Sequence, residues 1–341
     1  DINYEYNNKY TMDFSLTEEH LLIRDAAREF AQSELLPGVI ERDNKQEFPQ
    51  ELVRKMGELG FMGIMVDPKY GGSGMDTISY VLIMEELSKI DASASVMVSV
   101  NNSLVCYGLE AYGTEAQKQK YLTKLATGEH IGAFCLSEPE AGSDATSQAT
   151  TAIDMGDYYL LNGTKNWITN GGRSDVYLVI AQTDRAKGHR GINAFIVEKG
   201  MEGFHIGPKE DKLGIRGSDT HTLQFNEVKV PKENRIGEDG FGFKFAMKTL
   251  SGGRIGIAAQ ALGIASGGYE LALKYSKERK AFGTEICNHQ AIAFKLADMF
   301  TEIEAARMLV MKAAWLKDQK ENYDMASAMA KLYASKVAME Q

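Results

Sequence analysis

The chain has 341 residues, of which 25% are charged and 44% are apolar, as in an ordinary globular protein. Its formal net charge of −9 argues against nucleic acid or an anionic membrane as the main partner, because both select clustered Lys and Arg. No stretch approaches the roughly 20 apolar residues of a membrane span, and the three cysteines lack the spacing of a zinc site or disulfide framework. We therefore expect a cytoplasmic protein without a bound metal.

Helical periodicity dominates residues 12–128, after a polar stretch over residues 1–11 that we interpret as a leader or an extension. Ser15-Leu16-Thr17-Glu18 has the form of a capping box. The apolar positions that follow predict one buried helical face, formed by Leu21, Leu22, Ala26, Phe30 and Ala31. Further helices are expected over residues 49–59, 77–90 and 115–126.

Strand-like alternation replaces this pattern over residues 129–236. Asn162-Gly163 lies between two alternating runs and predicts a tight hairpin. Further strands are expected over residues 131–136, 176–182, 193–197 and 222–230. Helical periodicity returns over residues 237–341, in segments 241–278, 288–318 and 324–341. The sequence therefore predicts an α+β multidomain protein with a central β domain between two helical domains.

Two short segments carry the chemical signal. The run Cys135-Leu136-Ser137-Glu138-Pro139-Glu140-Ala141-Gly142-Ser143-Asp144 follows an apolar strand, and Trp167-Ile168-Thr169-Asn170 follows about 25 residues later. Backbone N–H groups and hydroxyls in such a loop can face phosphate or ring oxygens. Taken alone, the first run is also compatible with an ordinary turn between a strand and a loop.

Together, the two segments resemble the flavin-binding signatures of acyl-CoA dehydrogenases, and residues 211–218, 254–263 and 294–299 resemble the short-chain, butyryl-CoA-type branch. The resemblance covers residues 12–341 and implies FAD-dependent conversion of an acyl-CoA to a trans-2-enoyl-CoA. Within this chain it implies flavin contacts from Phe134, Cys135, Leu136, Ser137, Gly142, Ser143, Trp167, Ile168 and Thr169.

The same resemblance implies that Arg279, Phe282 and Gln290 reach the FAD of a neighbouring subunit. A guanidinium suits pyrophosphate, and a flat phenyl ring suits adenine or the flavin ring system. Without the resemblance, residues 277–280 read as a solvated charged turn. We therefore expect a homotetramer, with electron-transferring flavoprotein as the electron acceptor.

Substrate contacts implied by the resemblance are Ser143, Ser251, Gly252, Gly253 and Arg254. Relatives often carry Asp where this chain has Ser251. Some branches place the catalytic Glu where Gly253 stands, and glycine cannot remove a proton. The other branches place it in a Tyr-Glu-Gly-Thr motif near the C-terminus, which this chain lacks. We therefore expect no catalytic base in residues 1–341 and place it beyond Gln341.

Other catalytic patterns are absent from the sequence. The six histidines show no H-x-x-x-H pairing, and neither a G-x-S-x-G elbow nor a Walker loop occurs. Residues 237–242 are glycine-rich but lack the dinucleotide fingerprint. Two alternatives stay open: a non-catalytic or nucleic-acid-binding member of the same fold, and a flavin oxidase that passes electrons to oxygen.

Overall fold

The computed structural model describes residues 13–341, so the expected leader over residues 1–11 lies outside the described residues. Helices form the first part of the described chain, as the periodicity predicted, and several π-helical turns interrupt them. These elements are α1 (Glu18–Phe30), η1 (Ala31–Leu35), α2 (Val39–Lys45), α3 (Gln50–Glu58), η2 (Pro68–Tyr70), α4 (Thr77–Ser88), α5 (Ala92–Ser99), η3 (Val100–Cys106), α6 (Tyr107–Tyr112), α7 (Glu115–Gln117), η4 (Lys118–Leu122) and α8 (Thr123–Ala126).

The capping box of α1 lies two residues later than the sequence predicted. Thr17 is the N-cap: its hydroxyl accepts the His20 N–H, and the His20 Nδ1 accepts the Thr17 N–H, each at 3.2 Å. The box predicted at Ser15 and Glu18 is therefore wrong. A histidine can close the box because its ring nitrogen accepts the backbone proton as Glu or Gln would.

The predicted apolar face of α1 is also partly wrong. His20 is buried because its Nε2 lies 2.9 Å from the Asp76 carboxylate at the start of α4, and this contact fixes which side of α1 faces inward. Phe30 and Ala31 are buried as expected. The other three predicted positions are exposed: Leu21, Leu22 and Ala26.

A twisted, mostly antiparallel sheet follows the first helices. Its eight strands run in the order β6-β7-β3-β2-β4-β5-β8 within residues 13–341, and β1 pairs in parallel with β4. The strands are β1 (Gly132–Cys135), β2 (Thr151–Asp154), β3 (Tyr158–Thr169), β4 (Val176–Gln182), β5 (Ile192–Glu198), β6 (Phe204–Lys209), β7 (Thr220–Pro231) and β8 (Arg235–Ile236), with 3-10 turns η5 (Arg185–Gly191) and η6 (Lys232–Asn234).

The predicted hairpin at Asn162-Gly163 does not form. Both residues lie inside β3, and the register against β7 shifts between Leu161 and Gly163, so the pair forms a bulge. The Asn162 side chain accepts the Glu227 N–H at 2.8 Å across this bulge. Gly163 has φ +146°, and a Cβ there would lie 2.6 Å from the Thr150 Cα. The Asn-Gly pair serves a bulge as well as a turn, because both need unusual backbone angles and a close approach.

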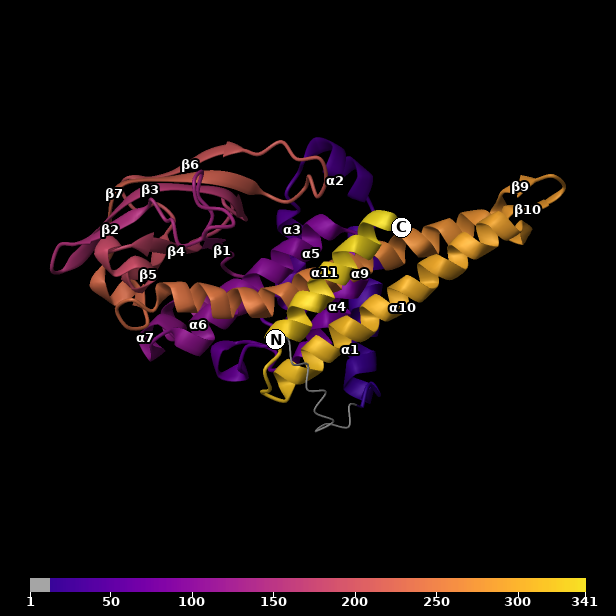
Figure 1. Cartoon of the computed structure of the whole chain (residues 1–341), viewed down its shortest axis with the longest axis horizontal. Helices are drawn as coiled ribbons and strands as arrows, with labels where there is room; N and C mark the ends of the chain where they lie inside the picture. Colours follow the sequence, from indigo (N-terminus) through magenta and orange to yellow (C-terminus); the bar gives the residue numbers. More distant parts are fainter. Residues whose placement is uncertain (1–12) are drawn as a thin grey trace, which may run out of the picture.

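Three long helical segments complete the chain, close to the predicted ranges. α9 begins beside β5 and contacts α4, α5, α10 and α11 along its length. Figure 1 shows it running from beneath the sheet to a small β9–β10 hairpin at the opposite end of the molecule. The elements are α9 (Gly242–Glu278), β9 (Lys280–Ala281), β10 (Thr284–Glu285), η7 (Ile286–Asn288), α10 (Gln290–Asp318) and α11 (Asp324–Glu340).

The core joins the sheet to the helices. One buried cluster combines side chains of β1, β4 and β5 with Phe245 and Ala246 of α9 and residues of α6. Because this cluster clamps the end of β1 against α9, it fixes where the loop after β1 emerges. Among the helices of residues 13–341, none combines the length and apolar character that crossing a bilayer requires.

Candidate functional site

The first predicted flavin segment begins inside the core and ends at the surface. Phe134 is 9% exposed, and its ring stacks on that of Phe245, with 6.2 Å between centroids. Cys135 is fully buried, and burial raises the pKa of its thiol, so this side chain is inert. Leu136 and Ser137 are half-buried, where regular structure stops. Cys135 can therefore offer a ligand only its backbone, whereas Leu136 and Ser137 offer their side chains as well.

The tip of this loop is open. Gly142 and Ser143 are exposed, and a Cβ added to Gly142 would meet no atom within 4 Å. Glu138, at the base of the loop, is instead 1% exposed and forms an ion pair with Lys165, at 2.6 Å from Oε1 to Nζ. The sequence pattern placed Glu138 in the predicted flavin loop, with an ordinary turn as the alternative, and indicated no role for Lys165. The signal for this pair was Lys165, a charged residue inside a run that alternates as a β-strand, because such a residue is buried only when it is paired.

The second predicted flavin segment lies beside the first. The Asn166 N–H donates to the Ser137 carbonyl at 2.9 Å, which joins β3 to the loop after β1. A register shift between Lys165 and Ile168 turns Trp167 outward, with φ +58° and 63% exposure. Ile168 is buried, so it packs in the core, and Thr169 is half-buried. An exposed indole next to an irregular loop fits a flat ring ligand, because the ring can stack on one aromatic face.

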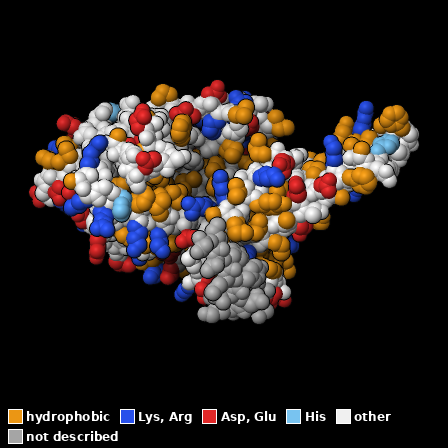
Figure 2. Space-filling view, viewed as in Figure 1, with side chains coloured by type: hydrophobic (Ala, Val, Ile, Leu, Met, Phe, Trp, Pro, Cys, Tyr) orange, Lys and Arg blue, Asp and Glu red, His pale blue; other side chains and the backbone are white. Residues whose placement is uncertain are grey.

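The residues predicted to reach the FAD of a neighbouring subunit lie at the far end of the molecule. Arg279, Phe282 and Gln290 lie around the β9–β10 hairpin, at the tip of the arm that α9 and α10 form (Figure 1). All three are exposed, and Phe282 is 98% exposed with φ +52°. In Figure 2 the arm projects from the body and gathers hydrophobic and basic side chains at its tip. One chain therefore does not bring these residues to β3, the strand that contains Trp167.

The predicted substrate residues lie on α9. Ser251 is 7% exposed, and its hydroxyl accepts from the Arg254 guanidinium at 3.3 Å. Gly252 and Gly253 are buried. A Cβ at Gly252 would lie 3.8 Å from the Tyr323 hydroxyl, and one at Gly253 would lie 2.7 Å from Leu104 Cδ2. Small residues here let α9 approach the neighbouring elements closely.

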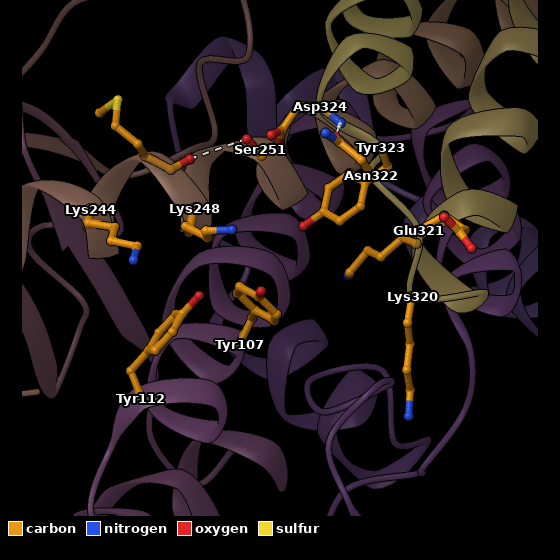
Figure 3. Close-up of a pocket in the computed structure, with 12 residues that line it drawn as sticks. Tyr107, Tyr112, Lys244, Lys248, Ser251, Lys320, Glu321, Asn322, Tyr323 and Asp324 are labelled. Carbon is orange, nitrogen blue, oxygen red and sulfur yellow. Dashed lines mark hydrogen bonds between the residues drawn. The ribbon is translucent and has the colours of Figure 1, made fainter.

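Ser251 also lines a pocket of about 700 Å³ between α6, α9 and the connection from α10 to α11. Figure 3 shows Tyr107 and Tyr112 rising from α6 and Tyr323 reaching in from the segment before α11. Lysines and tyrosines make up most of the polar lining. The lining residues are Tyr107, Tyr112, Lys244, Met247, Lys248, Ser251, Lys317, Lys320, Glu321, Asn322, Tyr323 and Asp324.

Four lysines against two carboxylates, Glu321 and Asp324, give the lining of this pocket an excess of basic groups, which suits an anionic ligand. Burial raises the pKa of Tyr112 to about 12, so its phenol stays neutral at physiological pH. Burial lowers the pKa of Lys317 to about 8, and its ammonium lies 5.2 Å from the centroid of the Tyr107 ring. Lys244 and Lys248 are exposed at the rim. Within residues 13–341, no group of three or more His, Cys, Asp or Glu side chains could hold a metal ion.

Three family models match the chain in the order of its structural parts. The acyl-CoA dehydrogenase N-terminal domain matches residues 17–129, the middle domain residues 133–228 and the C-terminal domain residues 240–341. The chain belongs to the acyl-CoA dehydrogenase family. Members of this family are oxidoreductases, and the helical, β and helical order of the fold agrees with the three matches.

Similar proteins include the short-chain-specific acyl-CoA dehydrogenase of Clostridium acetobutylicum, 52% identical over 96% of this chain and 87% of the relative. The caffeyl-CoA reductase–Etf complex subunit of Acetobacterium woodii is 48% identical over 95% of this chain and 86% of the relative. The solved structure of butyryl-CoA dehydrogenase from Megasphaera elsdenii is 49% identical and superposes with a TM-score of 0.95, covering 96% of this chain and 87% of that one.

Proposed function

We propose that this protein catalyses the FAD-dependent α,β-dehydrogenation of a short-chain acyl-CoA to the trans-2-enoyl-CoA. The hydrogen bond from Asn166 to Ser137 carries the proposal, because it holds the two flavin-signature segments side by side at the surface. The short-chain preference is supported by the 52% identity to the clostridial short-chain enzyme.

FAD would bind along the loop after β1 and the exposed end of β3. When bound, it supplies the acceptor for the hydride that leaves the β-carbon, through flavin N5. Trp167 offers a face for the ring, and the half-buried Thr169 lies two residues further along β3. Phe134, Cys135 and Ile168 would act mainly through shape and backbone, because their side chains are at least nine-tenths buried. The open tip supplies the remaining contacts, Gly142 and Ser143.

The acyl-CoA would lie along α9, with the thioester near Ser251 to Arg254 and the arm of the substrate near Ser143. Lysines at the rim of the 700 Å³ pocket, Lys244 and Lys248, suit its phosphates. The proton of the α-carbon is taken by a glutamate.

A second copy of the chain would complete each FAD site. The arm tip carries an always-charged Arg279 and an exposed Phe282, and Figure 1 shows the β9–β10 hairpin at this tip well away from the sheet that contains β3. Both fit the pyrophosphate and aromatic parts of FAD held by a neighbour. We therefore infer a homo-oligomer, for which the family resemblance implies a homotetramer. Electron-transferring flavoprotein is the proposed acceptor, in keeping with the Etf-complex name of the acetobacterial relative.

The deciding experiment is an absorbance spectrum of the purified protein before and after anaerobic addition of butyryl-CoA. A flavin spectrum that bleaches supports the proposal, and absence of flavin overturns it. Rapid peroxide formation in air during turnover would identify an oxidase instead. Salt-dependent retention of a flavin-free protein on heparin would favour the nucleic-acid-binding alternative.

A further inference from the structure

Three polar side chains are buried under the predicted flavin loop. Glu138 is 1% exposed, Gln148 is 3% exposed and Lys165 is 0% exposed. They come from the beginning of the loop, its end and β3. Residues 136–150 contain one isolated β-bridge, between Glu138 and Ala141, and no helix or strand, so no extended backbone ladder holds this loop in place.

The ammonium group of Lys165 has three hydrogen-bond acceptors around it. Its ammonium lies 2.6 Å from Glu138 Oε1, 2.5 Å from Gln148 Oε1 and 3.0 Å from the Leu136 carbonyl. An ammonium has three N–H donors, so every donor is used inside the protein. Burial lowers the pKa of Lys165 to about 8, and the Glu138 carboxylate opposes that shift. The lysine is therefore held as a cross-link rather than as a reactive amine.

The side chains of Glu138 and Gln148 form several hydrogen bonds with the loop backbone. The Glu138 carboxylate accepts the Ala149 N–H at 2.5 Å and the Thr150 N–H at 3.2 Å. The Gln148 amide donates to the Leu136 carbonyl at 3.3 Å and to the Ala145 carbonyl at 3.2 Å. These bonds close the loop on itself and take the place of regular secondary structure.

The same network reaches both flavin-signature segments. Lys165 binds the carbonyl of Leu136 and lies two residues before Trp167 on the same strand. Its neighbour Asn166 binds the carbonyl of Ser137 at 2.9 Å. The spacing between Leu136, Ser137 and Trp167 therefore depends on β3 and on the buried charge at its end.

Stability alone is a weak reason to bury such a pair. Replacing a buried ion pair by apolar side chains of similar volume is often neutral or stabilising. Apolar side chains would not hold the backbone groups of Leu136, Ala149 and Thr150. We propose that Lys165, with Glu138 and Gln148, is a positioning residue that shapes the loop over residues 136–150 to receive the flavin ring. This inference rests on the proposed FAD-dependent function.

The test compares FAD affinity with fold stability. The double variant Glu138→Leu/Lys165→Met removes the charges and keeps an apolar filling. FAD is titrated into the apo-protein while flavin fluorescence is followed, and Tm is measured on the apo-protein. We expect the Kd for FAD to rise by about tenfold or more and the bound-flavin spectrum to shift.

A control removes a partly buried ion pair elsewhere. Arg307 of α10 and Glu85 of α4 lie 2.6 Å apart in the helical part of the molecule, so Glu85→Leu/Arg307→Met should leave the Kd for FAD unchanged. Gln148→Met tests the network without removing a charge, and it decides the matter if the first double variant does not fold.

The outcomes separate this inference from the proposed function. If wild-type protein binds no FAD, the proposed function fails. If wild-type protein binds FAD and both network variants bind it with the same Kd and spectrum, the positioning role is overturned. A Tm loss equal to the control's, together with an unchanged Kd, would mean that the network serves stability only.

Discussion

The Asp318 carboxylate, at the last residue of α10, accepts the backbone N–H of Thr77, at the first residue of α4, at 2.8 Å. Its second oxygen accepts the Ile78 N–H at 3.2 Å. Asp76, the N-cap of α4, accepts only the Ser79 N–H from the backbone of this helix. A side chain from the other end of the chain therefore satisfies two of the free N–H groups at the start of α4.

Asp318→Ala should destabilise the protein. The variant leaves two partly buried N–H groups without their acceptor, so we expect the free energy of unfolding to fall by about 1–2 kcal/mol. Chemical denaturation measures this change. Asp298→Ala, at an exposed position of the same helix, should change it by less than about 0.5 kcal/mol. Equal effects of the two variants would contradict the capping role.

Gly256→Ala tests the close packing of α9. A Cβ at Gly256 would collide with the Tyr80 hydroxyl and lie 2.7 Å from Ser99 Oγ, so we expect a loss of about 1–3 kcal/mol in the free energy of unfolding. Gly268, on the same helix, has no atom within 4 Å of an added Cβ. Gly268→Ala should therefore stabilise by about 0.5–1 kcal/mol through helix propensity. The prediction fails if both variants shift Tm in the same direction.

The lowered pKa of Lys317 predicts that the stability of the protein depends on pH. Burial lowers its pKa from 10.5 to about 8, so the folded state holds this proton less tightly than the unfolded state. The cost of burying the charge is full below the folded pKa and disappears as the pH rises toward the unfolded value. Relative to Lys317→Met, the wild-type free energy of unfolding should rise by about 1–3 kcal/mol across this range.

Urea unfolding at several pH values measures this difference. Lys320→Met, at an exposed position in the same pocket, is the control and should show no such slope. A constant difference between wild type and Lys317→Met above and below pH 8 would rule out the lowered pKa.

Lys248→Glu tests whether the rim of the pocket meets an anionic substrate. Reversing this exposed charge should raise KM for butyryl-CoA by about 3- to 10-fold with little change in kcat, because the contact acts on binding and not on the reacting atoms. Steady-state kinetics at low salt measures both constants. Lys274→Glu makes the same change at an exposed position further along α9 and should leave KM unchanged. Equal KM values for the two variants would place the substrate elsewhere.

Arg279→Ala and Phe282→Ala test the shared FAD site. If the arm tip completes a neighbour's site, each variant should lose FAD during purification, and the ratio of flavin to protein absorbance would measure the loss. Lys277→Ala changes an exposed charge just before the hairpin and should keep full occupancy. Full FAD content in both arm variants would mean that each chain holds its cofactor alone.

The order of helices and strands was largely predictable, because periodicity depends on neighbours a few residues apart. The prediction of a hairpin at Asn162-Gly163 was wrong because it also depended on near neighbours alone. An Asn-Gly pair by itself does not show whether the chain turns or forms a bulge. The bulge forms because Gly163 lies close to Thr150 and the Asn162 side chain accepts the Glu227 N–H. Both contacts involve residues distant in sequence.

The sequence by itself determined the succession of helical, β and helical parts and predicted the two flavin segments, because both depend on short stretches of chain. The tertiary structure alone decided that Lys165 is buried against Glu138, and that Ser251 shares a pocket with Tyr107 and Tyr323. It also placed the β9–β10 hairpin, beside which Arg279 lies, away from the sheet that contains β3. Such proximities depend on how helices and sheet pack over the whole chain, and no local pattern contains that information.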